Sequence, residues 1–200
     1  MIAIVDYGSG NIRSLINALK SEEVILTADP GVLSAAKFIV LPGVGAFGYA
    51  MAQLEEKNLI HVLKALNAEK KKMVGICLGM QLFYERSDEH GIHEGLGFLK
   101  GKIKVLPDTV KKPHIGWNKL IVGKEDSLLT KGLKTDDFAY FVHSYYADDI
   151  STDSVVASTG YGISVPAIVH QDNLVGYQFH PEKSGQVGKL LLDNLKECFG

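Results

Sequence analysis

Cysteine is scarce in this sequence. Its 200 residues include two cysteines, Cys77 and Cys198, one tryptophan and six prolines. The two cysteines lie in very different sequence contexts, so no disulfide framework is expected. Proteins without disulfides are typical of reducing compartments. We therefore expect a cytoplasmic protein.

An excess of one charge and long apolar runs are also missing. The formal net charge is -2, whereas a nucleic-acid binder normally shows a basic face or stripe. No segment approaches the ~18 consecutive apolar residues of a membrane span. Residues 1–6 end on an acid and predict a buried strand, not a signal peptide. We expect neither nucleic acid nor a membrane as a partner.

What is present is typical of a globular protein. The sequence is 46% hydrophobic and 22% charged, which is ordinary for a folded domain. Its length suits one domain, and no linker, repeat or low-complexity segment interrupts it. We therefore expect a single domain over residues 1–200.

The first half alternates apolar runs with helical patterns. Strands separated by helices predict a parallel sheet covered on both faces, a doubly wound, flavodoxin-like α/β fold. The expected strands are residues 2–5, 23–26, 38–41 and 73–76. The expected helices are residues 11–20, 48–68 and 78–86.

The second half, after Gly91, has shorter apolar runs separated by Gly, Asp and Asn. This pattern is typical of antiparallel strands joined by turns. The expected strands are residues 102–106, 119–122, 138–147, 154–158, 167–170 and 174–179. Residues 185–198 predict a closing helix. The mostly parallel sheet is therefore expected to carry an added antiparallel region.

Cys77 lies in Gly-Ile-Cys-Leu-Gly, between an expected strand and an expected helix. This is the nucleophile-elbow pattern with cysteine in place of serine. A thiol at a helix N-terminus is favoured as thiolate. The N–H of Leu78, free in the first helical turn, can face an oxyanion. The alternative is that Cys77 is a small buried apolar residue.

His180-Pro181-Glu182 follows the last expected strand. Residues two apart in an extended segment project to the same side, so Glu182 can orient the imidazole of His180. A base oriented by a carboxylate is what thiol activation needs. Alone, the tripeptide is a weak signal; together with Cys77 it predicts a catalytic triad.

A glycine-rich loop, Pro-Gly-Val-Gly at residues 42–45, joins a strand to a helix. Its glycines allow an N–H near Val44 or Gly45 to point at an oxyanion. A plain tight turn is one alternative. A phosphate cradle is another, but the loop lacks the Gly-Lys-Ser/Thr ending of that motif.

Three further side chains stand out, two of which have two readings each. Gln81 lies one helical turn beyond Cys77 and can contact a substrate, or it is an ordinary exposed glutamine. Trp117, in an expected loop that also contains a proline and a glycine, packs in the core or anchors an interface. The strand pattern around His143 favours a structural role. No histidine has metal-ligand spacing, so neither a metal nor a cofactor is expected.

Two motifs, Gly-Ile-Cys-Leu-Gly-Met-Gln at residues 75–81 and Gln-Phe-His-Pro-Glu at 178–182, resemble the triad-type glutamine amidotransferases. Four stretches resemble the glutaminase subunits of imidazole glycerol phosphate synthases within that family: residues 42–45, 113–118, 141–145 and 180–184. The resemblance extends from Asp-Tyr-Gly-Ser-Gly-Asn at residues 6–11 to the last helix.

This resemblance implies an activity. Cys77 attacks the side-chain amide of L-glutamine and forms a thioester, His180 moves the proton, and Glu182 orients His180. The implied oxyanion-hole residues are Leu78, Val44 and Gly45. The implied substrate-binding residues are Gly45, Gln81, Ser144 and Tyr145.

The resemblance also implies a partner and no cofactor. The ammonia passes to a (β/α)8-barrel cyclase, with which the chain forms a heterodimer in histidine biosynthesis. The implied interface residues are Asn11, Trp117, Asn118, Tyr140 and Lys183.

Two other readings stay open. A similar chain can serve another synthase, such as one that amidates a nucleotide-linked sugar or chorismate, although the Gly-Trp-Asn loop speaks against chorismate. A cysteine hydrolase of the same fold shares the elbow but is not expected to share Gln81 or the His-Pro-Glu-Lys-Ser ending.

Overall fold

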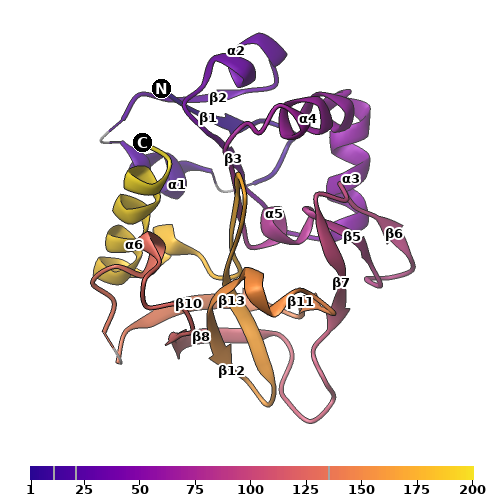
Figure 1. The fold of residues 1–200 in the computed structure, drawn as a ribbon. Helices are drawn as coiled ribbons and strands as arrows, with labels where there is room; N and C mark the ends of the chain where they lie inside the picture. Colours follow the sequence, from indigo (N-terminus) through magenta and orange to yellow (C-terminus); the bar gives the residue numbers. More distant parts are fainter. Residues whose placement is uncertain (11, 21, 135) are drawn as a thin grey trace.

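The computed structural model describes residues 1–10, 12–20, 22–134 and 136–200 (Figure 1). Within them the largest sheet has eight strands, in the order β2-β1-β3-β4-β14-β13-β12-β9. The strands from β2 to β14 run parallel, and those from β14 to β9 are antiparallel. Their bounds are β2 (Val24–Thr27), β1 (Ile2–Val5), β3 (Ile39–Leu41), β4 (Met73–Ile76), β14 (Leu174–Tyr177), β13 (Ser164–Gln171), β12 (Val155–Gly160) and β9 (Ile121–Val122).

Helices cover both faces of the parallel strands (Figure 1). Their bounds are α1 (Arg13–Leu19), α2 (Pro30–Ala35), α3 (Phe47–Glu56), α4 (Leu59–Ala68), α5 (Leu78–Gln81) and α6 (Gly185–Cys198). One buried cluster joins α1 and α6 to the sheet through Leu15 and Leu191. The other joins α3 and α4 to it through Leu54 and Leu63. Because both faces are covered, β1, β3 and β4 are buried along their whole length. The expected doubly wound α/β fold is confirmed.

The single helix expected over residues 48–68 is wrong: the structure has two helices, α3 and α4. Asn58 separates them with a left-handed backbone, φ 55°. Asparagine tolerates this conformation better than most residues. The apolar periodicity continues through the break, so periodicity did not reveal it. Helix α2 was not expected either; Asp29 caps it by accepting a hydrogen bond from the N–H of Val32, at 2.9 Å.

The helix expected over residues 78–86 is also wrong. Helix α5 is a single turn, and the chain then enters β5 (Tyr84–Ser87). Leu82 and Phe83, between them, are fully buried. An apolar run buried on all sides is compatible with helix or strand, so its pattern did not distinguish them.

The second half forms two further sheets, β11-β7-β5-β6 and the antiparallel pair β10-β8. Their remaining bounds are β6 (His93–Glu94), β7 (Leu99–Val105), β8 (His114–Lys119), β10 (Phe138–His143) and β11 (Tyr145–Asp148). Three short 3-10 helices complete the described elements: η1 (Leu128–Thr130), η2 (Thr152–Ser154) and η3 (Pro181–Lys183). The loop expected at residues 113–118 is thus mostly strand, and the strand expected over 138–147 is divided at Ser144.

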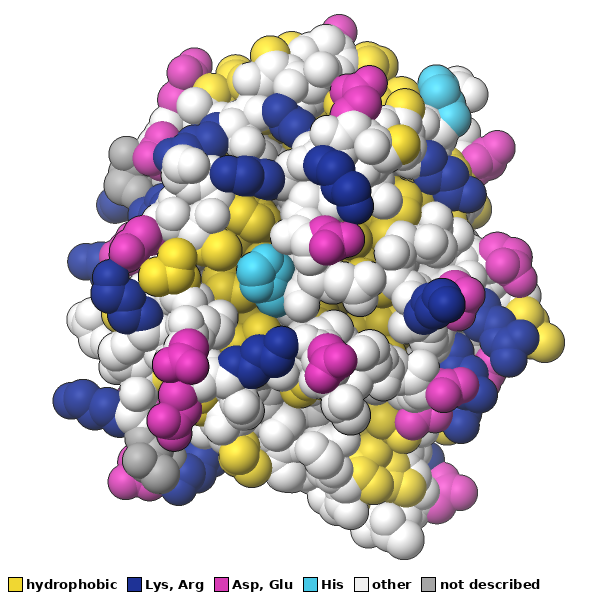
Figure 2. Space-filling model, viewed as in Figure 1, with side chains coloured by type: hydrophobic (Ala, Val, Ile, Leu, Met, Phe, Trp, Pro, Cys, Tyr) yellow, Lys and Arg dark blue, Asp and Glu magenta, His cyan; other side chains and the backbone are white. Residues whose placement is uncertain are grey.

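Basic and acidic side chains are interspersed on the face shown in Figure 2. Across the described part of the chain, no helix combines the length and the apolar character needed to cross a membrane.

Candidate active site

The carboxyl ends of three neighbouring strands meet at one edge of the large sheet. Strands β3, β4 and β14 are adjacent and parallel. The glycine-rich loop follows β3, Cys77 follows β4, and His180 lies three residues beyond β14. Such an edge is the usual ligand-binding position in open α/β sheets. The fold therefore brings together the motifs that the sequence separates by about a hundred residues.

Cys77 occupies a strained turn between β4 and α5. Its φ of 53° and ψ of -109° lie in a region that a non-glycine residue enters at a cost of ~1–3 kcal/mol. A Cβ at Gly75 would lie 2.5 Å from the backbone N of Met80, and one at Gly79 would overlap the carbonyl oxygen of Leu41. Glycine two positions before and after Cys77 is therefore what lets the elbow close.

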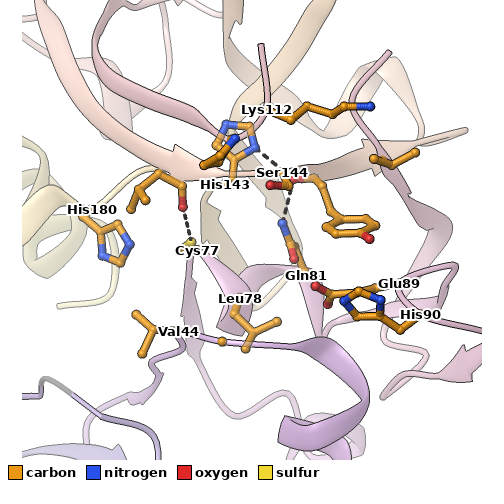
Figure 3. Close-up of a pocket in the computed structure, with 15 residues that line it drawn as sticks. Val44, Cys77, Leu78, Gln81, Glu89, His90, Lys112, His143, Ser144 and His180 are labelled. Carbon is orange, nitrogen blue, oxygen red and sulfur yellow. Dashed lines mark hydrogen bonds between the residues drawn. The ribbon is translucent and has the colours of Figure 1, made fainter. Parts of the chain in front are cut away.

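His180 and Glu182 form a buried pair beside Cys77. The Nδ1 of His180 lies 2.7 Å from Oε1 of Glu182, and their side chains are 3% and 6% exposed. The Nε2 of His180 has no hydrogen-bond partner in the described structure and the ring lies toward Cys77 (Figure 3). Burial alone would lower the pKa of His180, but Cys77 and Glu182 outweigh it and raise the pKa to about 9.

Backbone contacts hold the imidazole in this position. The N–H of His180 donates to the Tyr140 carbonyl at 3.0 Å. The hydroxyl of Ser184 donates to the His180 carbonyl at 2.7 Å and accepts from the N–H of Tyr140 at 3.0 Å. Strand β10 thus fixes the segment that carries the candidate base.

A cavity of about 510 Å³ opens beside these groups (Figure 3). It brings together the expected residues Val44, Gly45, Cys77, Leu78, Gln81, Ser144, Tyr145 and His180. Glu182 lies behind His180 and not in the cavity. Gln81 is 5% exposed, so the reading of it as an ordinary exposed glutamine is wrong.

The cavity also has charged residues that the sequence did not single out, Glu89 and Lys112. Glu89 is fixed by accepting a hydrogen bond from the backbone N–H of Phe47, at 2.6 Å. A carboxylate and an ammonium at one cavity suit a ligand that carries both charges. Neither lies in a motif, and both reach the cavity through turns, so no sequence signal marked them.

The expected interface residues gather around β8 and β10. Trp117 is 58% exposed, so the reading of Trp117 as a core residue is wrong. Its ring contacts Tyr140, directly opposite on β10, edge to face at 6.1 Å. Asn118 follows Trp117 on β8, and Lys183 lies in η3. Asn11 lies outside the described residues.

The sequence matches a known protein family over nearly its whole length. Residues 3–197 match the family "Glutamine amidotransferase class-I". The imidazole glycerol phosphate synthase subunit HisH of Aquifex aeolicus is 49% identical over 196 residues, covering 96% of this chain and 94% of that protein. The chain is a class-I glutamine amidotransferase of the HisH family.

Other members of the HisH family are similarly close. The subunit HisH of Lactiplantibacillus plantarum is 49% identical, with 98% of this chain and 95% of that protein covered. That of Methanothermobacter thermautotrophicus is 48% identical, with 98% of each covered. The chain therefore matches these family members over nearly their full length.

Solved structures of low identity share the amidotransferase fold. A crystal structure titled glutamine amidotransferase superposes with a TM-score of 0.76 at 18% identity, covering 99% of this chain and 96% of that one. The structure of PurLQS from Thermotoga maritima gives 0.73 at 21% identity, covering 100% and 98%. At these identities the likeness concerns the fold alone.

Proposed function

We propose that this chain is the glutaminase subunit of an imidazole glycerol phosphate synthase. It hydrolyses L-glutamine to glutamate and ammonia and delivers the ammonia to a cyclase subunit. The observation that carries the proposal is the buried His180–Glu182 pair beside Cys77 in a strained elbow, in a chain of the HisH family.

In the first half-reaction the Cys77 thiolate attacks the carboxamide carbon of glutamine. The C–S bond forms as the carbonyl π electrons move to oxygen. When they return, the C–N bond breaks, and the proton on His180 passes to the leaving nitrogen, so ammonia departs. The pKa of His180, raised to about 9, keeps the imidazolium available as this acid at neutral pH.

In the second half-reaction water opens the thioester. The now neutral His180 takes a proton from the attacking water, and the C–S bond breaks to release glutamate. Thiolate and imidazolium are thereby restored. The carboxylate of Glu182 holds Nδ1 throughout, at 2.7 Å, so that Nε2 faces Cys77 in both steps.

Both steps place negative charge on the former amide oxygen. The N–H of Leu78, in the first turn of α5, and an N–H of the loop at Val44 or Gly45 are the donors to this oxyanion. Gly45 has φ +102°, a conformation that glycine adopts without strain. The loop can therefore turn an amide toward the cavity.

Glutamine itself carries an ammonium and a carboxylate at its α-carbon. Glu89 is placed to pair with the ammonium. Gln81, Ser144 and Tyr145 also line the cavity and complete the proposed binding site. A site with fixed polar groups selects glutamine over apolar amides.

The second partner is the cyclase, a (β/α)8 barrel with which the chain forms a heterodimer. Trp117, which is 58% exposed, and the half-buried Tyr140 form an aromatic pair, and aromatic side chains are enriched in interfaces. Asn118 on β8 and Lys183 in η3 are the other proposed interface residues. The complex works in the cytoplasm, in keeping with a biosynthetic role. Residues 1–200 act as one domain, because both buried clusters share the large sheet.

The test combines product analysis with active-site labelling. The chain with its cyclase is expected to release glutamate from glutamine, and a glutamine analogue bearing an electrophile at the carboxamide position is expected to modify Cys77. Cys198, also a free cysteine, is the internal control. Absence of glutamate, or an adduct on Cys198 alone, would refute the proposal.

A further inference from the structure

A line of hydrogen bonds runs behind the cavity through three polar side chains. Asn118 Nδ2 lies 3.2 Å from His114 Nε2, and His114 Nδ1 lies 3.1 Å from His143 Nε2. His143 Nδ1 in turn lies 2.9 Å from the carbonyl oxygen of Tyr145. The two histidines are 3% and 6% exposed. Two imidazoles bonded ring nitrogen to ring nitrogen need one donor and one acceptor.

The orientation of Asn118 decides which nitrogen donates. Its Oδ1 accepts from the backbone N–H of Lys119 at 2.8 Å, and its Nδ2 donates to the Gly160 carbonyl at 3.0 Å. The amide is therefore fixed from both ends. Its Nδ2 faces His114 and can only donate.

One tautomer of each histidine follows from this. Because His114 Nε2 accepts, its proton is on Nδ1 and is donated to His143 Nε2. Because His143 Nε2 accepts, its proton is on Nδ1 and is donated to the carbonyl of Tyr145. Both rings are then neutral, and every polar atom of the line has a partner.

The surroundings favour the same neutral state. The ring of His114 is stacked between Phe141, at 4.9 Å, and Tyr161, at 3.9 Å. Burial lowers the pKa of His114. Burial, more than the neighbouring imidazoles, lowers the pKa of His143 to about 3. Neither ring is expected to take up a second proton at neutral pH.

The carbonyl of Tyr145 joins this line to Gln81, a residue that lines the cavity. It also accepts from Gln81 Nε2 at 2.9 Å. The same nitrogen donates to Gln178 Oε1 at 3.1 Å, and Gln178 Nε2 lies 3.9 Å from the sulfur of Cys77. A displacement of this carbonyl therefore moves the amides that lie beside the thiol.

We propose that Asn118, His114 and His143 are positioning residues that hold the carbonyl of Tyr145, and with it Gln81, in place for glutamine. Because Asn118 follows the exposed Trp117 on β8, contact at this face reaches the cavity through the two histidines. The kinetic test of this proposal rests on the proposed function. The histidine tautomers on which the proposal depends can be measured without it.

The tautomers are tested directly by ¹⁵N NMR of the histidine rings in the isolated chain. We expect His114 and His143 to carry their single proton on Nδ1 at neutral pH. Asn118→Leu removes the donor to His114, so both rings are expected to populate both tautomers. A proton on Nε2 of either ring in the unmodified chain would overturn the proposal.

A pair of substitutions at His143 separates positioning from simple packing. The amide nitrogen of asparagine can occupy the place of Nδ1, whereas the amide of glutamine reaches the place of Nε2. His143→Asn thus keeps the donor to Tyr145, and His143→Gln loses it. In the complex with the cyclase, His143→Gln is expected to raise the glutamine KM roughly fivefold, the effect of one hydrogen bond, and His143→Asn to leave it near normal.

Thr130→Val is the matched control. It removes another hydrogen bond from a buried side chain to a backbone carbonyl, from Thr130 to Lys124 at 2.8 Å, and neither residue belongs to the line or bonds to it. It is expected to lower stability and leave the glutamine KM unchanged. Equal KM values for His143→Asn and His143→Gln, or an equal rise in Thr130→Val, would overturn the proposal. An unmodified complex that releases no glutamate would refute the proposed function, and the NMR result would still decide the tautomers.

Discussion

At the scale of single residues, the proposed catalytic chemistry depends on the charge of His180. Its ring lies between Cys77 and Glu182 and is almost fully buried. A buried imidazolium persists only when neighbouring negative charge outweighs desolvation. These two neighbours do so, which is why the pKa of His180 lies above its ordinary value.

The pKa of His180 gives the first prediction. The pKa of His180 in the folded state is about 9, above its ordinary value of about 6.5. Protonation of His180 therefore contributes fully to the stability of the fold below pH ~6.5. That contribution is lost as the pH rises through about 9. Glu182→Gln removes one of the two groups that raise the pKa and is expected to lower it. NMR titration measures the pKa of His180 in the unmodified chain and in Glu182→Gln. An unchanged midpoint in Glu182→Gln would contradict the role of Glu182.

Substitutions of His180 and Glu182 are also expected to lower kcat to different extents. In the proposed mechanism His180 moves a proton in both half-reactions, whereas Glu182 orients His180, so His180→Ala should lower kcat more than Glu182→Gln. Loss of a general acid–base typically costs ~10²–10⁴-fold. Steady-state glutaminase assays of the complex at one pH decide the order, and a larger loss for Glu182→Gln would contradict it.

At the scale of elements, a side-chain hydrogen bond anchors the glycine-rich loop after β3. The Tyr7 hydroxyl, buried after β1, donates to the carbonyl of Pro42 at 2.6 Å. Burial raises the pKa of Tyr7 to about 12, so this hydroxyl keeps its proton and remains a donor. The loop that carries a proposed oxyanion donor is therefore anchored to the neighbouring strand.

Removing this hydroxyl is expected to loosen the loop. Tyr7→Phe leaves the Pro42 carbonyl without its partner, which should lower the free energy of unfolding by ~1–3 kcal/mol. It should also lower kcat, by up to ~10²-fold if an oxyanion donor is misplaced. Tyr84→Phe is the control, because the equally buried Tyr84 hydroxyl has no partner in the described structure. Denaturant unfolding and steady-state assays check both, and an unaffected kcat in Tyr7→Phe would separate the loop from catalysis.

Elements differ in how far the sequence predicts them. The strands that end at Val5 and Ile76 and the helix from Gly185 to Cys198 were predicted at their observed bounds, because each has a clear apolar pattern and a clear stop. The break at Asn58 and the strand at Tyr84–Ser87 were not, since tertiary burial overrides the local pattern there.

The candidate site divides in the same way. Cys77, His180 and Glu182 lie in motifs whose spacing carries their chemistry, so the sequence marked them. Glu89 and the pairing of His114 with His143 depend on how separate turns and strands meet. No spacing rule describes such contacts, and only the folded structure reveals them.

At the scale of the whole molecule, the proposed catalytic edge lies close to the pair formed by exposed Trp117 and half-buried Tyr140. Strand β10 carries Tyr140, whose carbonyl accepts from the backbone of His180, and ends at His143 beside the cavity. Contact of a partner with this face is therefore in position to alter the active site. Ammonia that is released without an acceptor is lost. Activation of the glutaminase by its bound partner would prevent this loss.

The chain alone is accordingly expected to be a poor glutaminase. Docking of the cyclase with its nucleotide ligand should increase kcat by ~10²–10³-fold, the typical worth of one oxyanion donor. Glutamate release is measured for the chain alone, with the cyclase, and with the cyclase and its ligand. Equal rates in all three, with complex formation shown separately, would contradict the coupling.

The central claim is that the thiol of Cys77 generates the ammonia that the cyclase consumes. The most direct measurement is formation of imidazole glycerol phosphate by the complex containing Cys77→Ala, with either glutamine or ammonium as the nitrogen source and Cys198→Ala as the matched variant. We predict no product from glutamine, an undiminished rate with ammonium, and normal use of both sources by Cys198→Ala. Continued glutamine-dependent product formation by Cys77→Ala would contradict the claim.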